Sequence, residues 1–181
     1  MNEKLQYYIN KIYRNKEWNY FREKCAESPI YLRKVMDRIS TLDKKAILYN
    51  RKDEPAIEIY VDFQEYSEGN FHVEYKSVLK ISKVANIFNF QHEYSIVNID
   101  PNRMSPVLEG FSDEAYIFEQ NRFDEAITKL LLAEGLEKLS LADMEEVIGD
   151  IQMPQETIFG SQMTIENCLF RDLFEICCIN D

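Results

Sequence analysis

The sequence predicts an α+β protein in which helices precede and follow a central antiparallel meander of three to four strands. Two observations lead to this prediction. Residues 56–99 hold the best-patterned β-region of the chain, and the segments on either side place apolar residues at helical spacing. We therefore read 181 residues as a single domain with a helical basic region (1–50), an antiparallel sheet (56–99) and an acidic helical region (109–181).

Alternation of apolar and polar residues identifies the strands. It runs over 57–63, which is typical of a half-buried strand, and resumes over 71–81 after a turn at 67–70. Residues 86–99 are rich in β-branched and aromatic side chains, which favours a third strand, although the first of them also fit a helical stripe. Short connections predict an antiparallel meander, and one apolar face predicts helices on one side only.

Apolar residues at helical spacing organise the first fifty residues. A stripe over 5–13 predicts an amphipathic helix that breaks near Asn15. Ser28 and Pro29 predict the start of a later helix, with the serine hydroxyl as its cap and the proline in the first turn. A further helical turn or two is expected to reach Tyr49.

Cap patterns predict two helices in the acidic region. Asn121 is expected to cap the first, which Gly135 ends. Ser140 and Asp143 repeat the cap pattern for a second helix, which is expected to continue until Gly149.

The remaining segments of this half are expected to be irregular or docked. Residues 102–112 are expected to form a loop, and 150–161 a linker containing proline and glycine. The stretch 164–179 is apolar enough to be buried against the domain, as helix or as edge strand.

Charge is distributed very unevenly along the chain, whose net charge is −11. Residues 1–50 hold eleven Lys/Arg against six Asp/Glu, residues 51–108 hold six against nine, and residues 109–181 hold four against seventeen. One interpretation is solubility together with attraction between the two ends of the chain. The other is an acidic surface that docks a basic protein partner.

The second interpretation predicts partner-binding residues on the acidic helices. These are Glu134, Glu137, Asp143, Glu145, Glu146 and Asp150. A nucleic-acid partner is not expected, because acidic residues are interspersed throughout the basic region.

Catalytic, cofactor and metal motifs are lacking in the sequence. It contains no P-loop, GxGxxG or GxSxG, so no cofactor, metal or catalytic residue is predicted. As an alternative, an enzymatic or small-molecule site is conceivable on the sheet face, where His72 and His92 would lie opposite each other near Tyr60 and Glu74.

The expected cellular compartment follows from sequence features that the chain lacks. It has no apolar run long enough for a membrane span and no signal-peptide pattern. Its four cysteines, which include adjacent Cys177 and Cys178, show no disulfide spacing. We therefore expect a reduced, cytoplasmic protein that does not associate with membranes, and we expect the cysteine pair to serve in packing.

In size, acidity and expected compartment, the whole chain resembles the small acidic immunity proteins with which bacteria neutralise interbacterial toxins, many of which are nucleases. No motif contributes to this resemblance. It implies a cognate toxin encoded beside this protein, occlusion of the toxin's active site, and no catalysis by the chain itself. A protein that mimics nucleic acid would share the acidic surface. Oligomeric state is left open.

Overall fold

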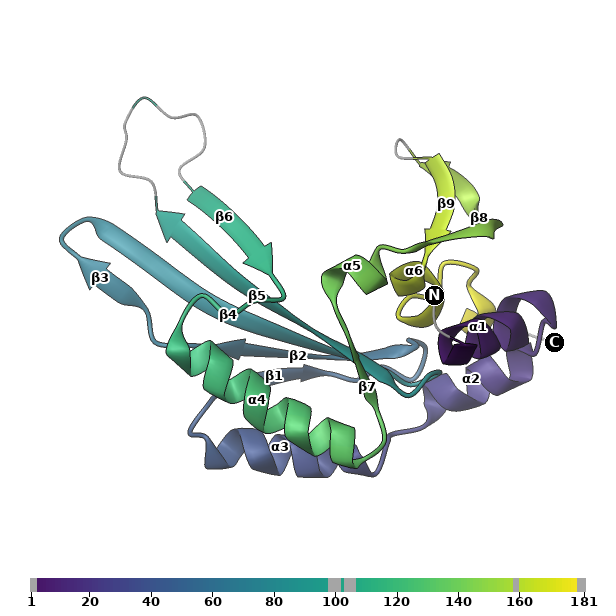
Figure 1. The fold of residues 1–181 in the computed structure, drawn as a ribbon, viewed down its shortest axis with the longest axis horizontal. Helices are drawn as coiled ribbons and strands as arrows, with labels where there is room; N and C mark the ends of the chain where they lie inside the picture. Colours follow the sequence, from purple (N-terminus) through teal and green to yellow (C-terminus); the bar gives the residue numbers. More distant parts are fainter. Residues whose placement is uncertain (1–2, 98–101, 103–106, 158–159, 179–181) are drawn as a thin grey trace.

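The computed structural model describes residues 3–97, 102, 107–157 and 160–178. N-terminal helices, a large and mostly antiparallel sheet, and C-terminal helices follow one another along the chain (Figure 1). The predicted α+β class is confirmed at this level. The central sheet is larger than predicted, because seven of the described strands join it.

The chain begins with four helical elements: α1 (Glu3–Ile9), the π-helical η1 (Asn10–Arg14), α2 (Trp18–Ala26) and α3 (Tyr31–Thr41). The predicted break near Asn15 is confirmed, since Lys16 adopts a positive φ of 57° between η1 and α2. Apolar residues of the predicted stripe, such as Leu5, Ile9 and Ile12, are buried. No helix within the described ranges is long and apolar enough to cross a membrane.

Helix α3 begins later than predicted. The predicted cap is wrong, because the residue before the helix is Ile30 and no side chain caps it. The Ser28 hydroxyl instead accepts a hydrogen bond of 3.3 Å from the side chain of Asn50. A tertiary contact with the loop after the first strand has thus replaced the local cap.

The central sheet consists of β1 (Ala46–Tyr49), β2 (Ala56–Asp62), β3 (Tyr66–Glu68), β4 (Phe71–Ser82), β5 (Ile87–Val97), β6 (Val107–Ser112) and β7 (Glu137–Leu139). Its order is β1-β2-β4-β5-β6, with β3 also pairing with β4 and β7 pairing with β5 in parallel. The three predicted strands are found as β2, β4 and β5 and pair antiparallel in this order, but they are part of a seven-stranded sheet and do not form a separate meander of three to four strands. Gly69, in the turn before β4, has the positive φ that the turn requires.

Strands β1 and β6 lie in segments that were expected to have other structures. Residues 46–49 were expected to be helical but form edge strand β1, because the chain leaves the helix at Asp43, where φ is positive, and pairs with β2. Residues 107–112, expected to be loop, form β6, which pairs with the outer edge of β5. The structure of both segments depends on pairing with a neighbouring strand, which a short local sequence pattern does not reveal.

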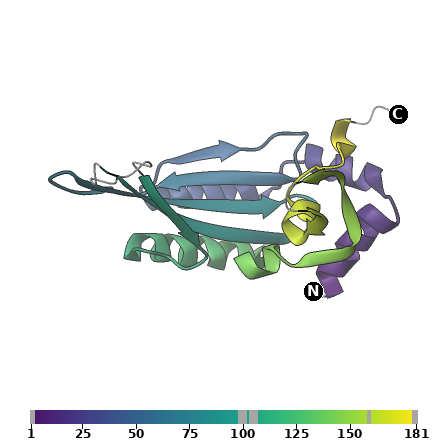
Figure 2. The same cartoon turned by 90° about the horizontal axis from the view of Figure 1, so that it is seen from above.

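Helices α3 and α4 (Phe118–Ala133) cover one face of this sheet (Figure 2). The prediction of helices on one side only is wrong, because a short helix over residues 165–169 contacts Lys80 and Ser82 on the other face. Register aligns Ile59, Leu79 and Phe90 across three strands of this face. All three are fully buried beneath the apolar sides of the two helices. Helix α4 starts before the predicted cap at Asn121, since Gln120 accepts hydrogen bonds from the backbone N–H groups just ahead of the helix.

The C-terminal elements are α5 (Leu141–Met144), β8 (Val147–Thr157), β9 (Gly160–Thr164), α6 (Ile165–Leu169) and the 3₁₀ turn η2 (Ile176–Cys178). The predicted Ser140–Asp143 cap is confirmed, since the Ser140 side chain accepts from the Asp143 backbone N–H. The continuation of this helix to Gly149 is wrong, and so is the linker over 150–161, because β8 and β9 form a hairpin.

Strand pairing explains this error. Val147 pairs with Thr164 and Ile148 with Met163, and both β8 residues are β-branched. The ladder shifts register between Ile148 and Gln152 and again between Gln152 and Thr157, and Pro154 lies within the second stretch, where a proline is tolerated. Residues 164–178 dock as predicted, as α6 and η2, with Cys168, Leu169 and Ile176 buried; Ile179, the end of the predicted segment, lies outside the described residues.

The oppositely charged ends of the chain meet in the fold. Among the described residues, four ion pairs join residues 1–50 to residues 109–181: Lys4–Glu137, Arg14–Asp150, Lys34–Glu134 and Lys44–Glu119. Part of the charge asymmetry seen in the sequence is therefore used within the molecule. This observation matches the first of the two interpretations of the charge distribution.

Candidate functional site

The middle of the sheet face opposite α3 and α4 is covered by no helix among the described residues. At one end of this open face, α6 packs against β4, where Lys80 pairs with Glu166 at 2.7 Å and the Ser82 hydroxyl donates to the carbonyl of Leu169. Beyond this contact the sheet twists away toward β6, and its open face lies between that strand and the C-terminal elements (Figures 1 and 2).

Strand register places the open-face side chains in rows that run across the sheet. One row contains Asp62, Lys76, Glu93 and Phe111. The next contains Glu74, Ser95 and Glu109. Carboxylates and an exposed aromatic ring thus come together from four different strands.

These two rows line a groove of about 790 Å³. Its carboxylates are Asp62, Glu65, Glu74, Glu93 and Glu109. Lys76 is the one cation among its described lining residues. The ring of Phe111, which is 62% exposed, stands in the same groove. The groove is therefore suited to a cationic ligand that also offers apolar surface.

The carboxylates of this groove differ in how far the protein itself neutralises them. Lys76 lies 3.8 Å from Asp62, and Glu93 accepts a hydrogen bond from a neighbouring amide side chain. Within the described part of the chain, the side chains of Glu74 and Glu109 have no hydrogen-bond or ion-pair partner. Since both flank Ser95, the least neutralised part of the groove lies around that residue.

A second depression, of about 430 Å³, lies on the same face toward edge strand β1. The rings of Tyr49 and Tyr60 meet there edge to face, with centroids 5.4 Å apart. The Tyr60 hydroxyl donates a hydrogen bond of 2.6 Å to Glu58, and this bond and partial burial raise the pKa of Tyr60 to about 12. The open face therefore continues from an acidic groove into an aromatic surface.

The six carboxylates predicted to bind a partner are spread over the end of α4, β7, α5 and β8. Three of them are engaged by cations of the N-terminal region: Glu134 by Lys34 at 2.6 Å, Glu137 by Lys4 at 3.8 Å, and Asp150 by Arg14 at 2.8 Å. The Arg14 hydrogen bond holds the pKa of Asp150 below its usual value.

The other predicted binding residues lie around the short helix α5. Asp143 accepts hydrogen bonds from the backbone and hydroxyl of Ser140, which lower the pKa of that carboxyl. Glu145 and Glu146 follow at the end of the helix, where Glu145 is exposed. The role of these six residues in binding a partner stays a prediction.

The expected juxtaposition of His72 and His92 is wrong. The turn after β4 is centred later than Ser82-Lys83, so His72 pairs with Val97 and His92 with Ser77. The two histidines are thereby separated by five residues along the sheet, roughly 17 Å, and they point to opposite faces. Together they form no site.

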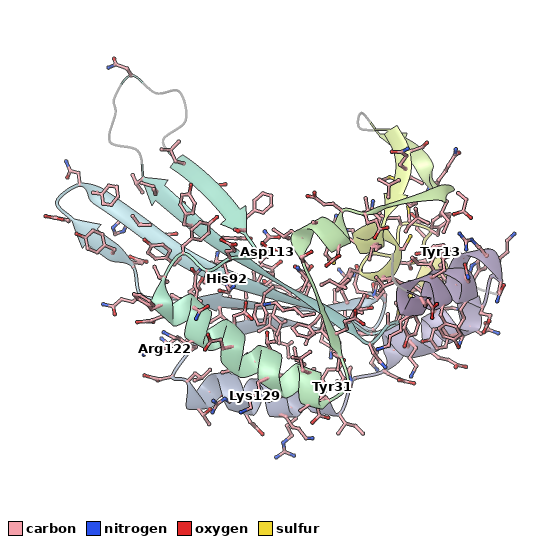
Figure 3. The ribbon with its side chains drawn as sticks, in the orientation of Figure 1. Tyr13, Tyr31, His92, Asp113, Arg122 and Lys129 are labelled. Atoms are coloured by element: carbon pink, nitrogen blue, oxygen red, sulfur yellow. The ribbon has the colours of Figure 1, made fainter. Side chains whose placement is uncertain are left out.

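His92 is instead part of a buried polar network between β5 and α4 (Figure 3). Its Nδ1 lies 2.8 Å from the Ser77 hydroxyl, and its Nε2 lies 3.1 Å from a carboxylate oxygen of Asp124. Asp124 also accepts hydrogen bonds from Thr128 and Lys138. Burial favours a raised pKa for Asp124, but the bonds from His92, Lys138 and Thr128 outweigh it and hold the pKa below its usual value.

This network has the composition of a Ser–His–Asp triad but cannot act as one. Ser77 and His92 are completely buried, so no substrate reaches the hydroxyl. The network satisfies polar groups beneath α4 and fixes that helix to the sheet.

Cys25, Cys168 and Cys177 are placed for packing, whereas Cys178 is exposed, so the packing role expected for the adjacent pair holds for Cys177 alone. Burial raises the pKa of the Cys25 thiol, which contacts Cys177, whose own pKa burial raises to about 11. Such thiols react slowly near neutral pH. Buried Lys83 donates to the carbonyls of Cys25 and Arg51, so it joins α2 to the loop after β1.

Sequence reasoning missed the groove although it identified most of the strands that form it. The alternation over 57–63 and 71–81 already placed Asp62, Glu74 and Lys76 on the polar face. Glu109 and Phe111 were assigned to a loop, so the strand that forms one wall of the groove was not predicted. No clear sequence signal marks β6, because its residues, VLEGFS over 107–112, do not alternate between apolar and polar.

Comparisons with protein-family models, curated proteins and solved structures found no match for this chain. Its function is therefore argued from the geometry of the open sheet face.

Proposed function

We propose that this chain is a non-catalytic binding protein that neutralises a basic protein by covering its working surface. This is the mode of action implied by the resemblance to bacterial immunity proteins. The observation that supports it is the open face of the central sheet, which combines an acidic groove with exposed aromatic side chains.

Charge and apolar area have different roles in such an interface. Unpaired carboxylates attract a basic partner over a distance, which raises the association rate and makes it dependent on salt. Aromatic side chains such as Phe111, Tyr49 and Tyr60 provide contact area that is buried on docking, which slows dissociation.

The alternative, an enzymatic or small-molecule site at His72 and His92, has lost its geometric basis. His72 is half-buried at the start of β4, and His92 is buried beneath α4. Among the described residues, no group of three or more His, Cys, Asp or Glu side chains is placed to hold a metal ion. The geometry thus favours binding of a protein.

Affinity capture followed by reconstitution tests the proposal. The tagged chain is used to capture proteins from its host at low and high salt, and each recovered protein is then produced alone. We expect one basic protein that binds the chain stoichiometrically, is released by salt, and loses its own activity in the complex. A recovered protein that keeps its activity in the complex, or the absence of any specific basic protein, would refute neutralisation.

Two charge-reversal variants locate the interface. Glu74→Lys/Glu109→Lys alters the groove, and Glu134→Lys/Glu145→Lys alters the originally predicted surface by the same net charge. We expect the groove variant to lower the association rate at least tenfold and the second variant to lower it less than threefold. The reverse result would place the interface on the acidic helices.

A further inference from the structure

The open part of the groove between β4 and β6 has the chemistry of an arginine site. Glu74 and Glu109 both lie beside Ser95, one on each neighbouring strand. Since adjacent strands are about 4.8 Å apart, their Cα atoms are roughly 10 Å apart across the sheet. Their side chains leave the sheet on the same face and have no partner among the described residues.

We propose that this groove binds an arginine side chain of a basic partner, with the guanidinium between Glu74 and Glu109 and against the ring of Phe111. This assignment rests on the proposed function and names the group that the partner supplies. A guanidinium is planar and offers several N–H donors, so it can bond two carboxylates at once and stack on an aromatic face.

The position of Phe111 gives the second contact. It lies two residues beyond Glu109 on β6, on the same face, opposite Glu93. Its ring is mostly exposed, although the neighbouring strands bury most of their apolar side chains. An arginine held by the two free carboxylates can therefore cover this ring, and a cation above an aromatic face is stabilised further.

Other cations fit this place less well. A lysine ammonium is a compact charge that cannot bond two separated carboxylates through a rigid fork. A metal ion needs at least three converging ligands in most protein sites, and no such group is present among the described residues. Nucleic acid would be repelled by the same carboxylates.

A peptide titration of the full chain, followed by NMR, tests the assignment without the natural partner. The probe is acetyl-Gly-Gly-Arg-Gly-Gly-amide, and the matched controls replace arginine with citrulline or lysine. We expect arginine to shift the backbone amides of Ser95, Glu109 and Phe111, with binding at least tenfold weaker for citrulline and several-fold weaker for lysine. Equal binding of the citrulline peptide would overturn the proposal.

Variants of the protein complete the test. Glu74→Gln/Glu109→Gln removes both charges with little change in shape, and Glu145→Gln, just after α5, is the control. The double variant should bind the arginine peptide at least tenfold more weakly, whereas the control should bind it unchanged. Shifts that gather on the acidic helices, or that persist in the double variant, would refute the groove.

The result is separable from the proposed function. If the arginine peptide binds in the groove but no basic protein is neutralised, the neutralising function falls and the arginine site stands. If a basic partner is neutralised while the double variant binds it normally, the function stands and the site falls.

Discussion

The two faces of the central sheet come from the same strands but have opposite surroundings. The covered face aligns Ile59, Leu79 and Phe90 under α3 and α4, whereas the open face aligns Asp62, Lys76 and Glu93 in a groove. The difference shows that one alternating pattern gives the sheet one face that stabilises the fold and one face that is available for binding. Burial of one face stabilises the fold, which leaves the other free to be selected for binding.

The largest effect should come from the covered face. Phe90→Ala removes a fully buried ring that packs against Phe88, His92 and Phe123. We expect it to lower the free energy of unfolding by about 3–5 kcal/mol in a urea titration. Phe111→Ala, on the open face, should change it by less than about 0.5 kcal/mol. Similar losses for both variants would mean that the open face also stabilises the fold.

The buried polar network should give the next largest effect. Asp124→Asn weakens the bonds from His92, Thr128 and Lys138, and should cost about 2–3 kcal/mol at pH 7. Because the folded-state pKa of Asp124 is lowered, its ionised form stabilises the fold above the unfolded pKa of about 4. This contribution is lost as the pH falls through the folded pKa.

The gap in stability between wild type and Asp124→Asn should therefore narrow below about pH 4. Urea titrations from pH 7 to pH 3 measure it. A gap that stays constant over that range would mean that the charge of Asp124 does not stabilise the network.

A smaller loss of folding stability should follow from adding one methyl group where β5 pairs with β6. A Cβ at Gly110 would lie 2.5 Å from the ring of Tyr94, which packs against Tyr116. Gly110→Ala should therefore cost about 1–2 kcal/mol and displace β6, which supplies one wall of the groove. Gly149→Ala is the matched control, since nothing lies within 4 Å of its added Cβ. Equal thermal stability of both variants would contradict this packing.

The smallest effect should come from the ion pairs that join the two ends of the chain. Lys34→Gln removes the partner of Glu134 and should lower the free energy of unfolding by about 0.5 kcal/mol at low salt. The difference should shrink as salt is added, because the pair is partly exposed. Lys129→Gln on α4 is the control, because this exposed lysine has no ion pair among the described residues. A loss that is insensitive to salt would point to packing instead of charge.

The sequence was most informative where one local pattern and the final environment agreed. Strands β2, β4 and β5, the turn at Gly69 and the Ser140 cap follow from alternation, glycine and capping chemistry, which act over a few residues. It was least informative for β1, β6 and the β8–β9 hairpin. These segments are short or irregular, and their structure depends on pairing with a neighbouring strand.

The candidate site shows the same division. The sequence determined that Asp62, Glu74 and Lys76 share a polar face, because alternate residues of a strand point to the same side. Only the tertiary structure decided which charges remain free, because that depends on neighbours distant in the chain. It paired Glu134 and Asp150 with N-terminal cations and brought Glu109 and Phe111 beside β5, so that two carboxylates without a partner among the described residues, Glu74 and Glu109, lie together on the open sheet face.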